Sequence, residues 1–286
     1  MPQHELRSDR LVVEIESDTT RLEADYGPRF DRSAQVTRIA TSARSWLSAP
    51  GLAGEFGLWG HGVLGYDEAS AGKGEFLKLG VGVLRKEIDE PYQLGRRWPV
   101  VRGAKTDVEA KPDQIGTRQR VNWNGWAYDF RKRYTVAQGG EFKIDYALKN
   151  TGEREIPFEH YNHNFFAVAR AAAPGGSVTI ETNFEQPAPP VSSKWIPNDK
   201  GVALTAATIP LRQPSWSWEL AGAVKSSRVR MQWSDRTAVT ICGDFPPTAF
   251  ALWAREEHVC PEIFYRQLLP PGGGASWSLA YHFEES

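Results

Sequence analysis

Two segments near the middle of the chain alternate between apolar and polar residues: Tyr128-Asp-Phe-Arg-Lys-Arg-Tyr-Thr-Val136 and Glu141-Phe-Lys-Ile-Asp-Tyr-Ala-Leu-Lys149. This period of two is typical of a β-strand with one buried face and one solvated face. Ala137-Gln-Gly-Gly140 joins them, and its glycines suit a tight turn. The pattern therefore predicts a β-hairpin from residue 128 to residue 149.

The same alternation recurs along the chain, whereas no segment keeps helical periodicity over three turns. Further predicted strands are Arg10–Glu16, Ala34–Ala40, Ser177–Glu181, Arg228–Trp233, Ala238–Cys242 and Ser276–Phe283. The clusters Pro187-Ala-Pro-Pro190 and Pro270-Pro-Gly-Gly-Gly274 are too short to be interdomain linkers. We predict an all-β fold, a large antiparallel β-supersandwich, in a single domain over residues 1–286.

Composition narrows the possible partners. The net charge of −1 and the isoelectric point near 6.6 provide no basic field for nucleic acid. No apolar run is long enough to cross a bilayer, and the start MPQHELRSDR lacks the apolar stretch of a signal peptide, so we expect a cytoplasmic protein without a membrane partner. Whether it is a monomer or a homodimer stays open.

The two cysteines, Cys242 and Cys260, have apolar neighbours and no CxxC spacing. This favours free thiols over a metal site and leaves their pairing open. Eleven tryptophans are the outlier of the composition. Those in polar surroundings are Trp59, Trp98, Trp123, Trp126, Trp195, Trp216 and Trp218. Aromatic rings can stack on the apolar faces of sugars, so we expect most tryptophans in the core and a few in a cleft.

The segment His160–Phe166 combines two histidines, two asparagines and three aromatic residues. On a strand, one face carries His160, Asn162 and Asn164, and the other carries Tyr161, His163 and Phe165. The two histidines therefore cannot chelate one metal ion. His163 is a candidate general acid, because imidazole titrates near neutral pH. The alternative is that both histidines are half-buried strand residues with satisfied hydrogen bonds.

A second polar residue, Glu262, interrupts an apolar passage between Cys260-Pro261 and Ile263-Phe264. A carboxylate in such surroundings either pairs with a cation or has a shifted pKa. Its possible partners are Arg255, His258 and Arg266. A buried ion pair without a catalytic role is therefore the alternative to a functional carboxylate.

Together the two segments resemble the galactose mutarotase-like family, which includes aldose 1-epimerases and hexose-6-phosphate epimerases. The first motif comprises Asn150-Thr-Gly152, Pro157-Phe158 and Asn162-His-Asn-Phe-Phe166, and the second comprises Val259-Cys-Pro-Glu262, Pro270-Pro-Gly272 and Trp277. The resemblance implies that His163 protonates the sugar ring oxygen and that Glu262 takes the proton of the anomeric hydroxyl. It implies no metal and no organic cofactor. Acid and base are expected on opposite sides of the pyranose.

The chain also departs from this family. A histidine followed by glycine in the first half is missing, and Leu79-Gly-Val-Gly-Val-Leu-Arg85 stands there. His61, or Lys78 with Arg85, is expected to replace its charge. A counterpart of the family's substrate-binding aspartate is also missing. The predicted substrate-binding residues are His61, Arg85, His160, Tyr161, Asn162, Asn164 and Arg266. Candidates for a substrate phosphate or carboxylate are Arg85, Arg131, Lys132 and Arg266.

Three functions remain. The first is an epimerase that interconverts anomers at C1 of an aldose or sugar derivative, with a small sugar or sugar phosphate as its partner. The second is a non-catalytic carbohydrate-binding protein on the same scaffold, which the missing histidine favours. The third is an enzyme related to polysaccharide lyases, for which Tyr161 is a candidate base, or to hydrolases, which need a carboxylate pair. The sugar and its phosphorylation state stay open.

Overall fold

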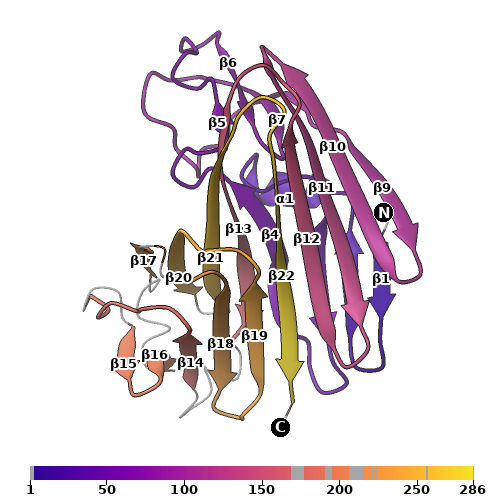
Figure 1. Ribbon diagram of the computed structural model, residues 1–286, viewed down its shortest axis with the longest axis vertical. Helices are drawn as coiled ribbons and strands as arrows, with labels where there is room; N and C mark the ends of the chain where they lie inside the picture. Colours follow the sequence, from indigo (N-terminus) through magenta and orange to yellow (C-terminus); the bar gives the residue numbers. More distant parts are fainter. Residues whose placement is uncertain are drawn as a thin grey trace.

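The computed structural model describes residues 3–168, 177–190, 195–205, 215–220, 222, 224–255 and 257–285. These residues form three antiparallel sheets, and the two larger sheets pack face to face (Figure 1). The apolar core lies between them, where Trp277 of one sheet stacks on Phe158 of the other. The predicted all-β antiparallel sandwich is confirmed.

The eight-stranded sheet has the order β1, β2, β3, β4, β13, β21, β20, β17. Its strands are β1 (Gln3–Arg7), β2 (Val12–Glu16), β3 (Gln35–Ala40), β4 (Leu47–Phe56), β13 (Ile156–Ala167), β21 (His258–Leu269), β20 (Ala249–Arg255) and β17 (Ser215–Glu219). β13 pairs with β4 on one side and with β21 on the other. Segments from the start, middle and end of the chain therefore meet at β13.

The ten-stranded sheet has the order β15, β16, β14, β18, β19, β22, β12, β11, β10, β9. Its strands are β15 (Ile196–Asn198), β16 (Gly201–Thr205), β14 (Ser177–Thr182), β18 (Ser227–Trp233), β19 (Ala238–Gly243), β22 (Gly274–Glu284), β12 (Glu141–Asn150), β11 (Trp126–Ala137), β10 (Gln114–Trp123) and β9 (Thr106–Lys111). The predicted hairpin is β11 and β12, with Ala137 opposite Glu141 at the turn.

The small third sheet lies at the top of the molecule in Figure 1. It consists of β5 (Val63–Leu64), β6 (Glu75–Lys78), β7 (Gly82–Arg85) and β8 (Val100–Gly103). A short helix, α1 (Thr20–Tyr26), lies between β2 and β3 in the chain. Its seven residues are too few to give a clear helical period, so the sequence did not predict it. Within the described ranges, no helix is long and apolar enough to span a membrane.

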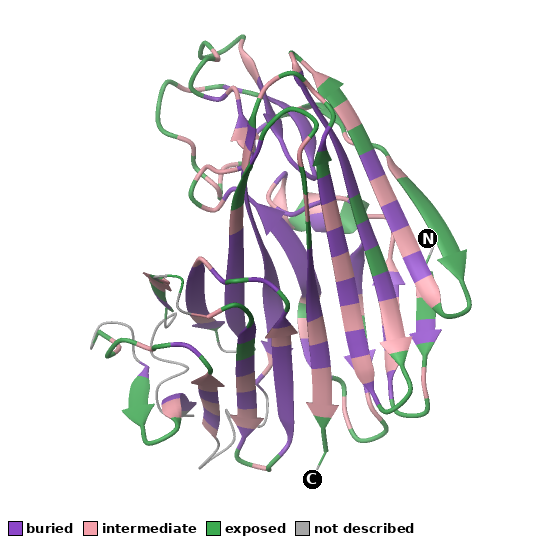
Figure 2. Cartoon of the chain, in the orientation of Figure 1, coloured by how far each residue is buried: buried purple, intermediate pink, exposed green. Residues whose placement is uncertain are grey.

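Burial differs between the two large sheets (Figure 2). β12 alternates between buried and partly exposed residues, as expected for a strand with one solvated face. β13 is buried along almost its whole length. Apolar side chains, including Leu22 of α1, Phe30 and Leu58, cover its face that points away from the ten-stranded sheet. Polar residues on this outer face are therefore held in a largely buried environment.

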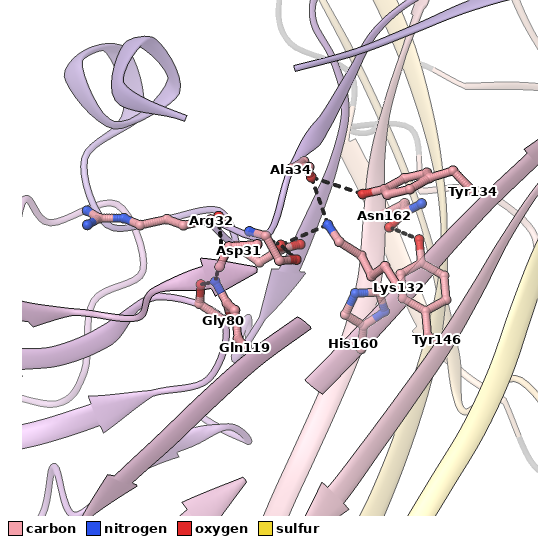
Figure 3. A network of polar contacts seen from close by, with 12 residues as sticks. Asp31, Arg32, Ala34, Gly80, Gln119, Lys132, Tyr134, Tyr146, His160 and Asn162 are labelled. Atoms are coloured by element: carbon pink, nitrogen blue, oxygen red, sulfur yellow. Dashed lines mark hydrogen bonds and ion pairs between the residues drawn. The ribbon is translucent and has the colours of Figure 1, made fainter. Parts of the chain in front are cut away.

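A buried polar network lies at the inner face of the sandwich (Figure 3). Lys132 Nζ on β11 is 2.9 Å from Asp31 Oδ1 and donates to the carbonyl of Ala34 at 2.8 Å. The hydroxyl of Tyr134 donates to the same carbonyl at 3.1 Å. Burial alone would lower the pKa of Lys132, but the adjacent Asp31 carboxylate raises it above its ordinary value. Lys132 is therefore a structural cation, which corrects its assignment as a phosphate ligand.

Cys242 lies on β19 and Cys260 on β21, in different sheets, and neither forms a disulfide. Burial raises the pKa of the Cys260 thiol well above its ordinary value. Cys260 is therefore a protonated core residue of the eight-stranded sheet.

Candidate active site

A cavity of about 510 Å³ opens on the outer face of the eight-stranded sheet and contains both sequence-predicted catalytic residues. Strands β13, β17, β20 and β21 contribute to it, together with the 57–62 loop and the segment before β3. Its described lining is Arg29, Leu58, Trp59, Tyr161, His163, Ser215, Trp216, Ser217, Ala251, Leu252, Trp253, Arg255 and Glu262. The lining combines aromatic walls with a few ionisable groups, as small-molecule sites commonly do.

His163 and Glu262 are in direct contact. Nδ1 of His163 is 3.0 Å from Oε1 of Glu262, and the two side chains are only 4% and 6% exposed. The two atoms are within ion-pair distance but are not aligned for a hydrogen bond. The imidazole stacks on Phe165, with ring centroids 4.1 Å apart, and meets Trp253 edge to face at 5.1 Å. Aromatic packing thus fixes the ring of His163.

Strand register explains why these two residues meet. The pairing between β13 and β21 is interrupted after His160, which lies opposite Tyr265, and resumes at Phe166, which lies opposite Val259. The register is the same on both sides of this gap. His163 is three residues after His160, and Glu262 is three residues before Tyr265. They therefore lie directly opposite each other, and opposed side chains project from the same face of a sheet.

The gap in the ladder is bridged by a side chain. Pro261, beside Glu262, has no N–H to donate to β13. Its carbonyl accepts a hydrogen bond from Asn164 Nδ2 at 2.6 Å. Asn164 Oδ1 in turn accepts a hydrogen bond from the Tyr281 hydroxyl at 3.0 Å. Asn164 thus fixes the backbone next to Glu262 from the core side.

The predicted alternation along β13 is observed, but its inner face does not reach the cavity. Trp277 Nε1 donates to His160 Nδ1 at 3.2 Å. The Tyr146 hydroxyl donates to Asn162 Oδ1 at 2.9 Å (Figure 3). Burial lowers the pKa of His160 to about 3, so it stays neutral. His160, Asn162 and Asn164 are core residues, which corrects their assignment as sugar ligands.

Arg29, Glu55 and Tyr161 form a polar cluster beside the pair. Arg29 Nε donates to both Glu55 oxygens at 3.0 and 3.1 Å, and the Tyr161 hydroxyl donates to Glu55 Oε2. Burial, and then the carboxylates of Glu55 and Glu262, raise the pKa of Tyr161 well above its ordinary value. Burial alone would lower the pKa of Arg29, but Glu55 raises it above its usual range. The cluster therefore presents a fixed guanidinium and a protonated phenol.

Sequence reasoning missed Arg29, although a signal was present. Glu55 is a charged residue inside the apolar run Leu52-Ala-Gly-Glu-Phe56, and a fully buried carboxylate requires a cation. Lys78, which was expected to supply charge, donates instead to the Arg29 backbone carbonyl at 2.6 Å. Burial lowers the pKa of Lys78 to about 8. Lys78 thus supports Arg29 and is not part of the described lining.

The other predicted basic residues are also outside the described lining. Arg85 is exposed on β7. Arg266 is 2.7 Å from Glu159 and 3.3 Å from Glu219, so two carboxylates already neutralise it. His61 is partly buried in the 57–62 loop. The structure therefore does not bring the predicted substrate-binding residues His61, Arg85 and Arg266 into the described lining.

Arg131 lies on a different surface. It projects from β11 of the ten-stranded sheet, where it pairs with Asp129 at 3.0 Å. Its assignment as a phosphate ligand of this site is therefore also corrected. Among the described residues, no three His, Cys, Asp or Glu side chains gather in a way that could hold a metal ion.

Three tryptophans line the cavity: Trp59, Trp216 and Trp253. Trp98, Trp126 and Trp195 are buried elsewhere. This division matches the expectation that most tryptophans fill the core and a few line a cleft. The three rings come from the 57–62 loop, β17 and β20, so different elements build the aromatic walls.

Comparison with solved structures identifies the architecture. The galactose mutarotase related enzyme from Lactobacillus acidophilus aligns with a TM-score of 0.62 at 13% identity, covering 99% of this chain and 98% of that one. The fold is that of the galactose mutarotase-like proteins. A GalM/aldose epimerase homologue from C. elegans aligns with a TM-score of 0.59 at 11% identity, over 99% of each chain.

A galactose mutarotase-like protein from Clostridium acetobutylicum gives a TM-score of 0.58 at 11% identity, over 99% of this chain and 95% of that one. No protein-family model and no curated protein matches the sequence. At such low identity these similarities extend to the fold alone. The activity has to be argued from the site.

Proposed function

We propose that the protein interconverts the anomers of an aldose or aldose derivative at C1, with His163 as the acid and Glu262 as the base. The contact between these two side chains carries the proposal. Both are nearly buried, they touch without an aligned hydrogen bond, and both line a cavity with aromatic walls. Buried polar atoms without aligned partners are rare in folded proteins, and a functional role is one explanation for them.

The short separation requires a correction to the expected geometry. A gap of 3.0 Å leaves no room for a pyranose between His163 and Glu262, so they cannot act from opposite sides of the ring. The chemistry does not require this. The anomeric hydroxyl oxygen O1 and the ring oxygen O5 are both bonded to C1, so the groups that serve them can also lie side by side. An acid and a base in contact are compatible with that arrangement.

The reaction then proceeds in balanced steps. The Glu262 carboxylate takes the O1 proton, the O1 electrons form the C1 carbonyl, and the C1–O5 bond breaks. The released electron pair on O5 takes a proton from the His163 imidazolium. Because Nδ1 faces Glu262, Nε2 is the nitrogen that delivers this proton. Rotation about C1–C2 and reversal of the same steps give the other anomer.

Two other enzyme classes fit the cavity less well. A lyase would need Tyr161 as a phenolate base, but its hydroxyl donates to Glu55 and its pKa is raised by burial and by neighbouring carboxylates. A hydrolase would need two carboxylates at a defined separation. Glu262 is the only carboxylate among the described lining residues.

The second candidate is a carbohydrate-binding protein without turnover. The missing first-half histidine favours it, because His61, Lys78 and Arg85 are all outside the described lining. Under the epimerase proposal, Arg29 supplies the fixed positive charge on the cavity wall instead. A binder would keep the aromatic walls and need no acid and base pair.

Anomer exchange measured by saturation-transfer NMR tests the proposal. The panel contains free hexoses and hexose 6-phosphates. The proteins are the wild type, Glu262→Gln and, as a matched control, Glu257→Gln at an exposed residue just before β21. We expect exchange above the spontaneous rate in the wild type and the control, and a loss of at least about 100-fold in Glu262→Gln. Line broadening from binding, without exchange for any sugar, would support the binder instead.

A further inference from the structure

Trp59 is the feature of the cavity that the acid and base chemistry does not use. Trp59 is 43% exposed, and no other Phe, Tyr or Trp among the described residues is as exposed. It nevertheless lines the same cavity as His163 and Glu262. An exposed indole at the edge of a ligand cavity offers a flat apolar surface whose exposure is unfavourable until a partner covers it.

The indole is held in place by its loop and by the side chains beneath it. The Gly57 N–H donates to the Glu159 carbonyl at 3.3 Å, and the Glu159 N–H donates to the His61 carbonyl at 3.2 Å, so both ends of the 57–62 loop are bonded to β13. Gly57 has φ of 84°, a conformation that favours glycine. The indole packs on Phe264, with ring centroids 4.7 Å apart. Trp59 is thus a supported platform.

The position of the platform relative to the pair is set by β21. Phe264 is two residues beyond Glu262, so the indole above it lies one side-chain row away, about 7 Å along the strand. A pyranose with its hydroxyls is roughly 6 Å across, from bond lengths of about 1.5 Å. A sugar that presents C1 to His163 and Glu262 would therefore place its next ring near Trp59.

The size of the cavity agrees with a ligand of more than one ring. A hexose has twelve heavy atoms, and at the liquid-water share of about 30 Å³ each they fill at most about 360 Å³. The cavity measures about 510 Å³, which leaves room beyond one hexose.

The charges around the platform indicate what kind of ring it accepts. Arg266 lies over the indole, with its Cζ 5.7 Å from the ring centroid, and is paired with Glu159 and Glu219. With two carboxylates around one guanidinium, this end of the cavity carries no excess positive charge. Burial, and then the charge of Arg266, lower the pKa of the neighbouring His61, so it adds no positive charge near neutral pH. A phosphate or uronate would find no unpaired cation among these groups.

We infer that Trp59 is the stacking platform for a second, uncharged sugar ring, so that the substrate is the reducing end of a neutral disaccharide or longer oligosaccharide. The inference rests on the proposed function for the identity of the reacting ring. Trp59 would then form a second sugar subsite and determine the specificity for the length of the sugar chain.

The test compares anomer exchange at the reducing end of maltose, cellobiose and lactose with exchange of glucose and galactose. The proteins are the wild type, Trp59→Ala, Trp59→Phe and the control Trp123→Ala, which removes a partly exposed tryptophan that stacks on Trp126 outside the cavity. We expect Trp59→Ala to lower kcat/KM for at least one disaccharide by 10- to 100-fold, in line with measured aromatic stacking on flat ligands. The loss for hexoses should be at least about fivefold smaller than that for the disaccharide. All values for Trp123→Ala should stay within about twofold, and Trp59→Phe should keep most of the activity.

Two outcomes would overturn the inference: an equal loss on hexoses and disaccharides in Trp59→Ala, or a wild type that acts on hexoses and not on disaccharides. If no sugar shows exchange, the proposed function fails. Ligand-observed NMR then measures disaccharide binding and tests the role of Trp59 separately. Binding of a disaccharide to the wild type but not to Trp59→Ala would support the platform. Equal binding by the two proteins, or no binding by either, would contradict it.

Discussion

His163 and Glu262 stand almost one hundred residues apart in the sequence and share one buried contact in the fold. Glu55, only two strands away, shows what a structural carboxylate looks like in the same sheet, because both of its oxygens accept hydrogen bonds. Glu262 Oε1 has no aligned donor. A buried charge that lacks aligned partners costs stability, so Glu262 is better explained by chemistry than by folding.

This difference gives a prediction about stability. Glu262→Gln should change the free energy of unfolding by less than about 1 kcal/mol, because it removes a poorly satisfied charge. Glu55→Gln should lower it by about 3–5 kcal/mol, because the Arg29 guanidinium would lose its buried partner. Urea unfolding of both variants checks this. A larger loss in Glu262→Gln than in Glu55→Gln would show that Glu262 is the structural carboxylate.

The two central residues of the proposed site could be named from the sequence, but not all of their neighbours. The composition of His160–Phe166 and the position of Glu262 in an apolar run were visible without a structure. Alternation shows which residues share a face of β13, but it does not show which face meets the core. His160 was therefore misassigned. Glu55 in its apolar run indicated a buried cation, but Arg29 contacts Glu55 only through the tertiary fold, so no local pattern identified Arg29 as that cation.

At the scale of elements, the site depends on the interruption between β13 and β21. The register is kept across the gap, yet the ladder is bridged by Asn164 rather than by backbone bonds to Pro261. Asn162 lies on the same face of β13 and is equally buried, but its hydrogen bonds go to Tyr146 and Tyr281 of the other sheet. Asn164 therefore positions the backbone beside Glu262, whereas Asn162 has a structural role.

Replacing each asparagine by alanine tests this difference. Both Asn164→Ala and Asn162→Ala should lower the free energy of unfolding by about 1–3 kcal/mol, because each leaves buried partners unsatisfied. Only Asn164→Ala should also lower kcat for anomer exchange, by about tenfold or more, measured well below the unfolding temperature. Equal effects of the two variants on kcat would remove the positioning role from Asn164.

The contact of the segment before β3 with β4 gives a second prediction at this scale. A Cβ added at Gly54 would overlap Asp31 Oδ2 and press on His160 Nε2. Gly54→Ala should therefore lower the free energy of unfolding by about 1–3 kcal/mol. Gly95→Ala is the control, because its added Cβ meets no atom within 4 Å. Thermal unfolding of both variants checks the prediction, and similar midpoints would contradict the packing described here.

For the whole molecule, alternation along the strands predicted the all-β sandwich and its central hairpin. It did not predict the strand order, because β13 pairs with β4 and β21 from distant parts of the chain and alternation carries no information about partners. The four short strands of the small sheet gave too few residues for a pattern. The pairing of β13 with β21 brings His163 opposite Glu262. The candidate residues could therefore be predicted from the sequence, but their arrangement in space could not.

The buried histidine of the core makes stability depend on pH. Burial lowers the pKa of His160 to about 3, whereas an unfolded histidine titrates near 6.5. Between these values the unfolded chain binds a proton that the folded chain does not bind. The contribution of neutral His160 to the free energy of unfolding is therefore fully present above about pH 6.5. It is lost as the pH falls from about 6.5 toward 3.

Denaturant unfolding between pH 6 and pH 4.5 measures this contribution. The free energy of unfolding of the wild type should fall with pH more steeply than that of His160→Asn. The difference in slope should be about 1.4 kcal/mol per pH unit, the value for one proton. Equal slopes for the two proteins would show that His160 takes up a proton in the folded state.

The central claim is that His163 and Glu262 act together on one anomeric carbon. The most direct measurement is the anomer exchange rate, for the best substrate, of the wild type, His163→Gln, Glu262→Gln and the double variant. Groups that act as a unit show strongly non-additive losses. We predict that each single variant loses nearly all exchange above the spontaneous rate and that the double variant loses little more. Substantial exchange in either single variant, or independent losses that multiply in the double variant, would contradict the account.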